Sequence, residues 1–375
     1  MEPLLDLSKE YGIVLDGGGA RGAYQIGAWK ALKEAGVKVN AVAGTSVGAL
    51  NGALICMDDV ENAEKIWTGM TFSKVMDVDD DWMERLFSHE NKFTEVIAEI
   101  WKRLSDGGVD VTPLRKLIHE VIDEEKIRSS GKEFCLLTFS LTDFKELDLS
   151  LDDIPKGMLE DFLLASAYLL GFKNEKLHGK RYIDGGVVNN VPLKSLVNRG
   201  YTDIIEIRIY GPGREPRVKL PEGAEKYQIG PRVGLGSIID FESKRSRQNL
   251  KIGYFDAKRM LYGLEGFIYY VAQTHEDGWF EEQLADITEI EKAEMAFVLK
   301  LPLTFTVKAL YMAMLEASAK QMRIPKYQIY TTDELYNLTA ERYEALADKI
   351  HLPRFTHVLM NLGRDNTMNL KEETF

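Results

Sequence analysis

The chain has 375 residues, of which 45% are hydrophobic and 28% are charged, and its formal net charge is −12. This composition indicates a globular protein with a sizeable core, and the negative charge excludes a global basic field for nucleic acid or for an anionic membrane. The two cysteines, Cys56 and Cys135, exclude a disulfide scaffold and predict reduced, buried thiols in a cytoplasmic protein. The N-terminus lacks the pattern of a secretory signal and no run is long enough to span a bilayer, so any membrane contact is expected to be peripheral.

Strand and helix patterns alternate near the N-terminus. The pattern of residues 11–15 predicts a buried strand, and a glycine-rich loop separates this strand from a helix that we expect over 23–35. Residues 37–43 predict a second strand, and the small apolar residues 47–55 predict a closely packed helix. This order predicts a mainly parallel sheet with helices on its faces.

The segment after residue 60 is harder to interpret. Residues 61–70 fit a helix, and an acidic run then leads into Trp82, Leu86, Phe87 and Phe93, which alternate with charged residues. Such a stretch fits either a mobile lid over a lipid site or a surface insertion whose aromatic side chains pack inward.

The rest of the chain continues the mixed pattern and then becomes helical. A helix is expected from about residue 111 to 125, with Thr112 as its N-cap and Pro113 at its first position. The pattern beyond about residue 263 predicts a C-terminal helical extension (263–375) after a catalytic domain over 1–262. The remaining predicted elements are strands over 134–142, 181–183 and 204–210, and helices over 158–170, 237–261, 281–300, 306–323 and 332–349.

The pentapeptide Gly44-Thr45-Ser46-Val47-Gly48 lies between the second predicted strand and its helix. A serine at such a corner adopts strained backbone geometry and presents its hydroxyl, while the flanking glycines let the neighbouring backbone come close. The pattern therefore favours Ser46 as a nucleophile, and a simple glycine-rich turn is the alternative.

The glycine-rich loop over 17–22 fits two chemistries. It satisfies G-x-G-x-x-G after a strand, but a dinucleotide site also needs an acidic residue near the end of the second strand, and residues 37–45 contain none. The other use is an oxyanion hole, in which the glycines let the backbone aim its N–H groups at the developing charge, and Arg21 either adds positive charge or braces the loop.

A serine nucleophile requires a base, and no histidine follows a predicted strand end in a catalytic context. Asp184 is better placed, because it ends a short strand and precedes two glycines. Its carboxylate could contact the serine directly, although an Asp-Gly pair also favours an ordinary turn.

Three segments together resemble the patatin-like phospholipase family: Asp16-Gly17-Gly18-Gly19-Ala20-Arg21-Gly22, Gly44-Thr45-Ser46-Val47-Gly48 and Asp184-Gly185-Gly186. The resemblance covers roughly residues 9–262. It implies a three-layer α/β/α fold and a Ser–Asp dyad of Ser46 and Asp184, with an oxyanion hole of Gly17, Gly18 and Gly19 supported by Arg21.

The resemblance also implies hydrolysis of lipid acyl esters, including phospholipids, through an acyl-serine intermediate. The chain lacks H-E-x-x-H and paired C-x-x-C motifs, so neither a metal nor another cofactor is expected. A non-catalytic or dinucleotide-binding α/β module remains the alternative. The sequence departs from the family pattern at residues 168–172, where the family often has a proline and an aromatic residue. The preferred length of the acyl chain therefore stays open. The lipid head group and the oligomeric state stay open as well.

Overall fold

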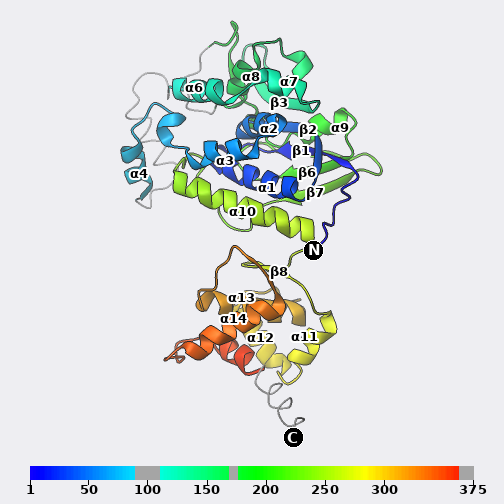
Figure 1. Cartoon of the computed structure of the whole chain (residues 1–375), viewed down its shortest axis with the longest axis vertical. Coiled ribbons are helices and arrows are strands. Elements are labelled where there is room, and N and C mark those ends of the chain that lie inside the picture. The colour runs from blue at the N-terminus through cyan, green and yellow to red at the C-terminus, as the bar shows by residue number, and fades with distance from the viewer. Residues whose placement is uncertain (89–109, 169–175, 363–375) are drawn as a thin grey trace. The chain divides into compact units, whose positions relative to one another are not determined.

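The computed structural model describes residues 1–88, 110–168 and 176–362 (Figure 1). The chain folds as two compact units, Met1–Leu261 and Tyr262–Phe375. Two features discussed above lie outside the described residues, namely Phe93 and the segment 169–172.

The described part of the first unit is built on a seven-stranded sheet with the order β4-β3-β2-β1-β6-β7, and β5 also pairs with β3. Strands β3, β2, β1, β6 and β7 are mutually parallel, whereas β4 and β5 run antiparallel to β3. The mainly parallel sheet confirms the predicted fold class. The strands are β1 (Glu10–Leu15), β2 (Lys38–Thr45), β3 (Glu133–Ser140), β4 (Lys145–Ser150), β5 (Tyr182–Asp184), β6 (Asp203–Ile207) and β7 (Glu225–Ile229).

Helices cover both faces of this sheet. Helix α2 (Val47–Met57) packs over the face that carries Val42 and Phe134. On the other face, side chains of alternate strand residues pack against α9 (Leu193–Asn198) in a cluster that includes Val14, Ala41, Ala43, Cys135, Val191, Leu193 and Leu196.

Helices α1 (Ala23–Glu34) and α10 (Ser243–Tyr262) lie side by side at very short range (Figure 1). A Cβ placed on Gly27 would lie 1.9 Å from the carbonyl oxygen of Leu250, and one on Gly253 would lie 1.9 Å from that of Tyr24. Only glycine permits this approach of the two backbones. The first and last helices of the unit are therefore interlocked.

Several element boundaries differ from the sequence predictions. Val111, not Thr112, is the N-cap of α6 (Thr112–Val121), and no side chain caps that helix. Helix α10 begins at Ser243, six residues later than predicted, and β4 and β7 were not predicted. The other helices of the unit are α3 (Val60–Thr68), α4 (Asp80–Ser88), α7 (Glu124–Ser129) and α8 (Leu159–Ser166), with 3-10 turns at Gly19–Gly22, Phe72–Lys74, Leu151–Asp153 and Gly185–Val187.

The second unit has its own hydrophobic core, to which Tyr269, Phe280, Leu315 and Tyr330 contribute. A buried carboxylate, Glu316, accepts hydrogen bonds from three consecutive N–H groups at residues 267–269, so it orders the approach to the first strand of the unit. The elements are β8 (Tyr270–Ala272), which pairs parallel with β9 (Ile329–Thr331), and α11 (Asp277–Gln283), α12 (Glu289–Val298), α13 (Val307–Gln321) and α14 (Thr332–Ala345).

Candidate active site

Ser46 occupies a strained turn between β2 and α2. Its backbone angles are φ 56° and ψ −127°, in a region that residues other than glycine rarely adopt, and its side chain is almost fully buried. The turn also requires a small residue at position 48, because a Cβ there would lie 2.4 Å from the carbonyl oxygen of Leu15. Strain and close packing are the features expected of a nucleophile elbow.

The backbone of Ser46 is held by a second serine. The N–H of Ser46 donates to Oγ of Ser166 at 2.9 Å, and that hydroxyl donates to the carbonyl oxygen of Leu137 at 2.5 Å. Ser166 therefore ties the turn to β3 from the end of α8. Sequence analysis did not single out Ser166, because its partner is 120 residues away.

The register of β3 brings Asp184 to this turn. Strand β2 ends with Thr45 opposite Leu137, while β5 ends with Asp184 opposite Thr138, the next residue of β3. Strand β4 pairs with the other edge of β3 over Cys135–Ser140, so β2 and β5 share one edge and meet end to end. The structure thus places residues 46 and 184 beside each other although 138 positions separate them in the chain.

The carboxylate of Asp184 is in an unusual electrostatic environment. Burial raises its pKa from 3.8 to about 6, and hydrogen bonding by the Ser46 side chain and by the N–H of Gly186 only partly opposes this rise. Oδ1 accepts the Gly186 N–H at 2.7 Å, whereas buried Oδ2 has no hydrogen-bond partner among the described residues. The Ser46 hydroxyl therefore interacts with this carboxylate without the full geometry of a hydrogen bond, as is common without substrate.

The glycine loop after β1 lies against the serine turn. The N–H of Gly17 is shared between the backbone oxygen and Oδ1 of Asn190, at 3.3 and 3.2 Å. The N–H groups of Gly18 and Gly19 have no acceptor among the described residues. Of the three predicted oxyanion donors, Gly17 is thus already engaged, and the next two remain available.

Asn190 was not singled out by sequence analysis, yet it joins three parts of the site. Besides its two acceptor contacts with Gly17, its Nδ2 donates to the carbonyl oxygens of Gly17 and Gly211, at 3.2 and 3.1 Å. Because it follows Asp184 by only six residues, it couples the glycine loop to the segment that carries the carboxylate.

Arg21 and Asp16 brace the two ends of the glycine loop. Arg21 donates to the carbonyl oxygens of Gly236 and Tyr210, at 2.9 and 2.8 Å. Fully buried Asp16 forms an ion pair with Arg208 at 3.1 Å and accepts the N–H groups of residues 209 and 210. Burial nevertheless raises the pKa of Asp16 to about 6, with the Arg208 charge as the main opposing influence. These contacts fix the loop rather than presenting groups to a substrate.

The described histidines lie away from this site. None of them lines the cavity beside Ser46, and each contacts another partner. The pairs are His119 with Glu160, His178 with Asp161, His275 with Asp333, His351 with Asp348 and His357 with Tyr343.

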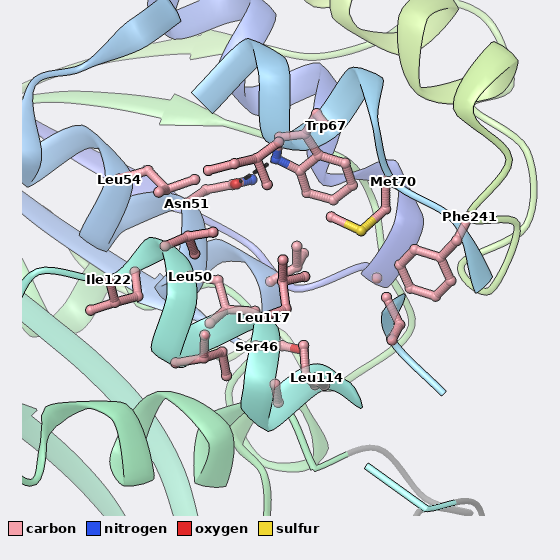
Figure 2. Close-up of a pocket in the computed structure, with 17 residues that line it drawn as sticks. Ser46, Leu50, Asn51, Leu54, Trp67, Met70, Leu114, Leu117, Ile122 and Phe241 are labelled. Atoms are coloured by element: carbon pink, nitrogen blue, oxygen red, sulfur yellow. Dashed lines mark hydrogen bonds between the residues drawn. The ribbon is translucent and has the colours of Figure 1, made fainter. Parts of the chain in front are cut away.

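An apolar cavity opens beside Ser46 (Figure 2). It encloses about 710 Å³ including its open mouth, and its walls come from α2, α3, α6 and the loop before α10. Leu50 and Leu54 follow Ser46 at intervals of four residues, so they line successive turns of one face of α2. The remaining lining residues are Gly19, Val47, Asn51, Ile66, Trp67, Met70, Val75, Leu114, Leu117, Ile118, Val121, Ile122, Ala167 and Phe241.

The polar atoms of the Asn51 side chain form hydrogen bonds within the wall of the cavity. It accepts from Trp67 Nε1 at 2.9 Å and donates to Gln25 Oε1 at 2.8 Å, and Gln25 in turn donates to the carbonyl oxygen of Asp16 at 2.8 Å. The cavity therefore offers a nearly uniform apolar surface. This buried network also connects its wall to the start of the glycine loop.

The lid interpretation of the segment after residue 76 stays a prediction. Trp82 is half-buried on α4, and the side chains of Leu86, Phe87 and Phe93 lie outside the described ones. Within the part of the chain that the structure describes, no group of histidine, cysteine or acidic side chains is arranged to hold a metal ion. No helix in the same part is long and apolar enough to cross a membrane.

Comparison with known proteins matches most of the first unit to one family. Residues 13–197 match the family model described as patatin-like phospholipase, which confirms the resemblance of the three motifs. Neuropathy target esterase sws of Drosophila melanogaster is 29% identical over 202 residues, which are 53% of this chain and 13% of that protein. The protein of the same name from Drosophila sechellia is 30% identical over 185 residues, which are 48% of this chain and 11% of that protein. The match thus spans 13% or less of these relatives' length.

Two solved structures are similar over most of the chain. VipD from Legionella pneumophila has 14% sequence identity and a TM-score of 0.43, over 97% of this chain and 86% of that chain. ExoU of Pseudomonas aeruginosa, solved in complex with SpcU, has 14% sequence identity and a TM-score of 0.32, over 96% of this chain and 71% of that chain.

Proposed function

Because residues 13–197 belong to the patatin-like phospholipase family, we propose that this chain hydrolyses acyl esters of lipids through a covalent acyl-serine intermediate. The nucleophile is Ser46 and the base is Asp184. The observation that carries the proposal is the cavity, because an apolar cavity that opens beside a strained serine suits a fatty acyl chain.

In the first half of the reaction, Oγ of Ser46 attacks the ester carbonyl carbon while Asp184 takes its proton. The N–H groups of Gly18 and Gly19 stabilise the negative oxygen of the tetrahedral intermediate, and Gly17 and Arg21 hold the loop in shape. Collapse of this intermediate releases the alcohol, which takes the proton from Asp184. A water molecule then attacks the acyl-serine while Asp184 takes its proton. Collapse of this second tetrahedral intermediate releases the fatty acid, and Asp184 returns the proton to Oγ of Ser46.

The dinucleotide-binding alternative is disfavoured by the packing of the glycine loop. A Cβ on Gly211 would lie 1.9 Å from the carbonyl oxygen of Gly17, and one on Gly18 would lie 2.7 Å from Ile209. Residues 209–211 therefore pack directly against the loop, which leaves less room around it for a pyrophosphate.

A fluorophosphonate probe tests the proposal directly, because it labels only an activated serine. We expect one labelled site, identified as Ser46 by peptide mass spectrometry, and protection by a palmitoyl ester. Release of palmitate from a panel of lipids then defines the head group and the position of cleavage. An unlabelled folded protein that hydrolyses no acyl ester would contradict the proposal.

The direction of α2 predicts how acyl-chain length is selected. Leu54 lies two helical turns, about 12 Å along the axis, from Ser46. Leu54→Trp should therefore block the far part of the cavity and lower kcat/KM for a palmitoyl ester about tenfold, the scale of an overpacked site, with little change for a butyryl ester. Val233→Trp, on an exposed loop of the same unit, is the matched control. Equal losses on both esters would show that the chain does not run along α2.

A further inference from the structure

The turn between β3 and β4 projects beyond the sheet at the end where Ser46 lies. Strand β2 stops at Thr45 opposite Leu137, whereas its parallel neighbour β3 continues in the same direction to Ser140. Three further residues of extended chain correspond to about 10 Å. Residues 141–144 thus form a tip that lies beyond the end of β2, at the same end of the sheet as Ser46.

This tip is held in place by hydrogen bonds to the segment before β5. The N–H of Leu141 donates to the carbonyl oxygen of Arg181 at 2.9 Å, and the N–H of Arg181 donates to Thr142 Oγ1 at 2.9 Å. Lys180 adds an ion pair with Asp143 at 2.6 Å. Residues 141–144 and 180–181, here called the hairpin tip, are therefore one ordered surface.

The hairpin tip exposes apolar side chains. Phe144 is 82% exposed and Leu141 is 42% exposed, and the ring of Phe144 touches only the edge of Phe139 among its described aromatic neighbours. Phe144 also has a φ of 52°, a left-handed conformation that is unfavourable for a bulky residue. Neither the exposure nor the backbone strain stabilises the folded chain, and the ring is accessible to a partner outside it.

The charge at the hairpin tip differs in sign from that of the whole chain. Its exposed cations outnumber its acids by one, with Lys180 and Arg181 against Asp143, whereas the chain carries −12. An exposed aromatic ring among cations is the combination that favours the interface of an anionic bilayer.

The shape and size of the hairpin tip decide between a lipid surface and a protein partner. A stable protein interface buries about 800 Å² on each side and involves some 20–30 residues. A convex turn with two exposed apolar side chains offers much less, but it suffices to insert into a bilayer surface. We propose that the hairpin tip binds the surface of lipid aggregates and brings the active-site end of the sheet against them.

The inference rests on the proposed lipid hydrolysis for its purpose, but its test requires no turnover. The full-length Ser46→Ala protein is sedimented with vesicles of phosphatidylcholine containing one quarter phosphatidylserine. Adding Phe144→Asn, which suits the left-handed backbone, should lower the vesicle-bound fraction about tenfold, the scale of losing one buried aromatic side chain. Phe144→Gly should have the same effect and guards against a defect specific to asparagine, while circular dichroism verifies folding.

Leu303→Asn is the matched control, because Leu303 is fully exposed in the second unit and loses a similar apolar surface. We expect it to bind vesicles like the parent. Absence of vesicle binding by the parent, unchanged binding of both Phe144 variants, or an equal loss in Leu303→Asn would overturn the proposal. Failure of the proposed function would instead appear as absent hydrolysis of a soluble butyryl ester by the wild-type chain, a separate measurement.

Discussion

Replacement of Ser46 by alanine is expected to abolish acyl-ester hydrolysis and leave the chain folded. The reaction needs Oγ as the nucleophile, and no other described hydroxyl lines the cavity. Loss of a nucleophile that acts in a catalytic unit lowers kcat by roughly a thousandfold or more. Turnover of a butyryl ester and the thermal melting curve measure the two effects.

The folded state should tolerate Ser46→Ala because the side chain makes few contacts that alanine lacks. The N–H that donates to Ser166 is retained, and the strained backbone is the same for alanine as for serine. Ser130→Ala, outside the cavity, should keep full activity and serves as the control. Activity of Ser46→Ala above a few per cent of wild type would refute the assigned nucleophile.

Asp184→Asn should lose nearly as much activity, because an amide cannot accept the proton of Ser46. Its Oδ1 can still accept the Gly186 N–H, so the turn should keep its shape. The fluorophosphonate labelling rate should fall together with kcat, since both depend on activation of the serine. Unchanged labelling with reduced turnover would move the role of Asp184 to a later step.

The raised pKa of Asp184 predicts how wild-type activity depends on pH. The base acts only when ionised, so kcat/KM for a soluble ester should rise with pH through about 6 and then level off. A profile that rises near pH 4 would indicate a carboxylate with an ordinary pKa and would contradict the effect of burial.

The same raised pKa predicts that the stability of the folded chain falls with rising pH, whereas activity rises. Because the folded-state pKa lies above the ordinary value of 3.8, the folded chain binds the proton more tightly than the unfolded chain. This contribution to stability is complete below pH 3.8 and is lost as pH rises through 6, by about 3 kcal/mol at most. Asp184→Asn lacks the buried charge, so it should be no less stable than wild type at pH 8 in a urea titration. A marked destabilisation there would mean that ionised Asp184 holds the site together.

Those parts of the site that need special local geometry could be predicted from sequence. The strained turn at Ser46 and its close contact at Gly48 leave a pattern within five residues, and the glycine loop does the same. The approach of Asp184 depends instead on the register of β3, which no spacing in the chain reveals. Asn190 and Ser166 could not be identified from the sequence, because their hydrogen-bond partners Gly17 and Ser46 are more than 100 residues away. Polar residues are also common in turns, so their presence alone indicates no function.

The predicted boundaries of helices were wrong where tertiary contacts determine at which residue the helix begins. The start of α10 was placed six residues early because residues 237–242 continue an amphipathic pattern. In the structure, the carbonyl oxygen of Ile238 instead accepts the N–H of Ala20 at 2.8 Å, a contact that an early helix would prevent. The capping role expected of Thr112 failed because the turn begins one residue earlier.

The interlocked glycines of α1 and α10 have a consequence for biosynthesis. Gly27 meets its partner only after Leu250 has left the ribosome, 223 residues later. At 5–20 residues per second, this delay is roughly 10 to 45 s. The apolar face of α1 must therefore wait uncovered throughout that interval, which makes the nascent first unit a natural client for chaperones that shield hydrophobic segments.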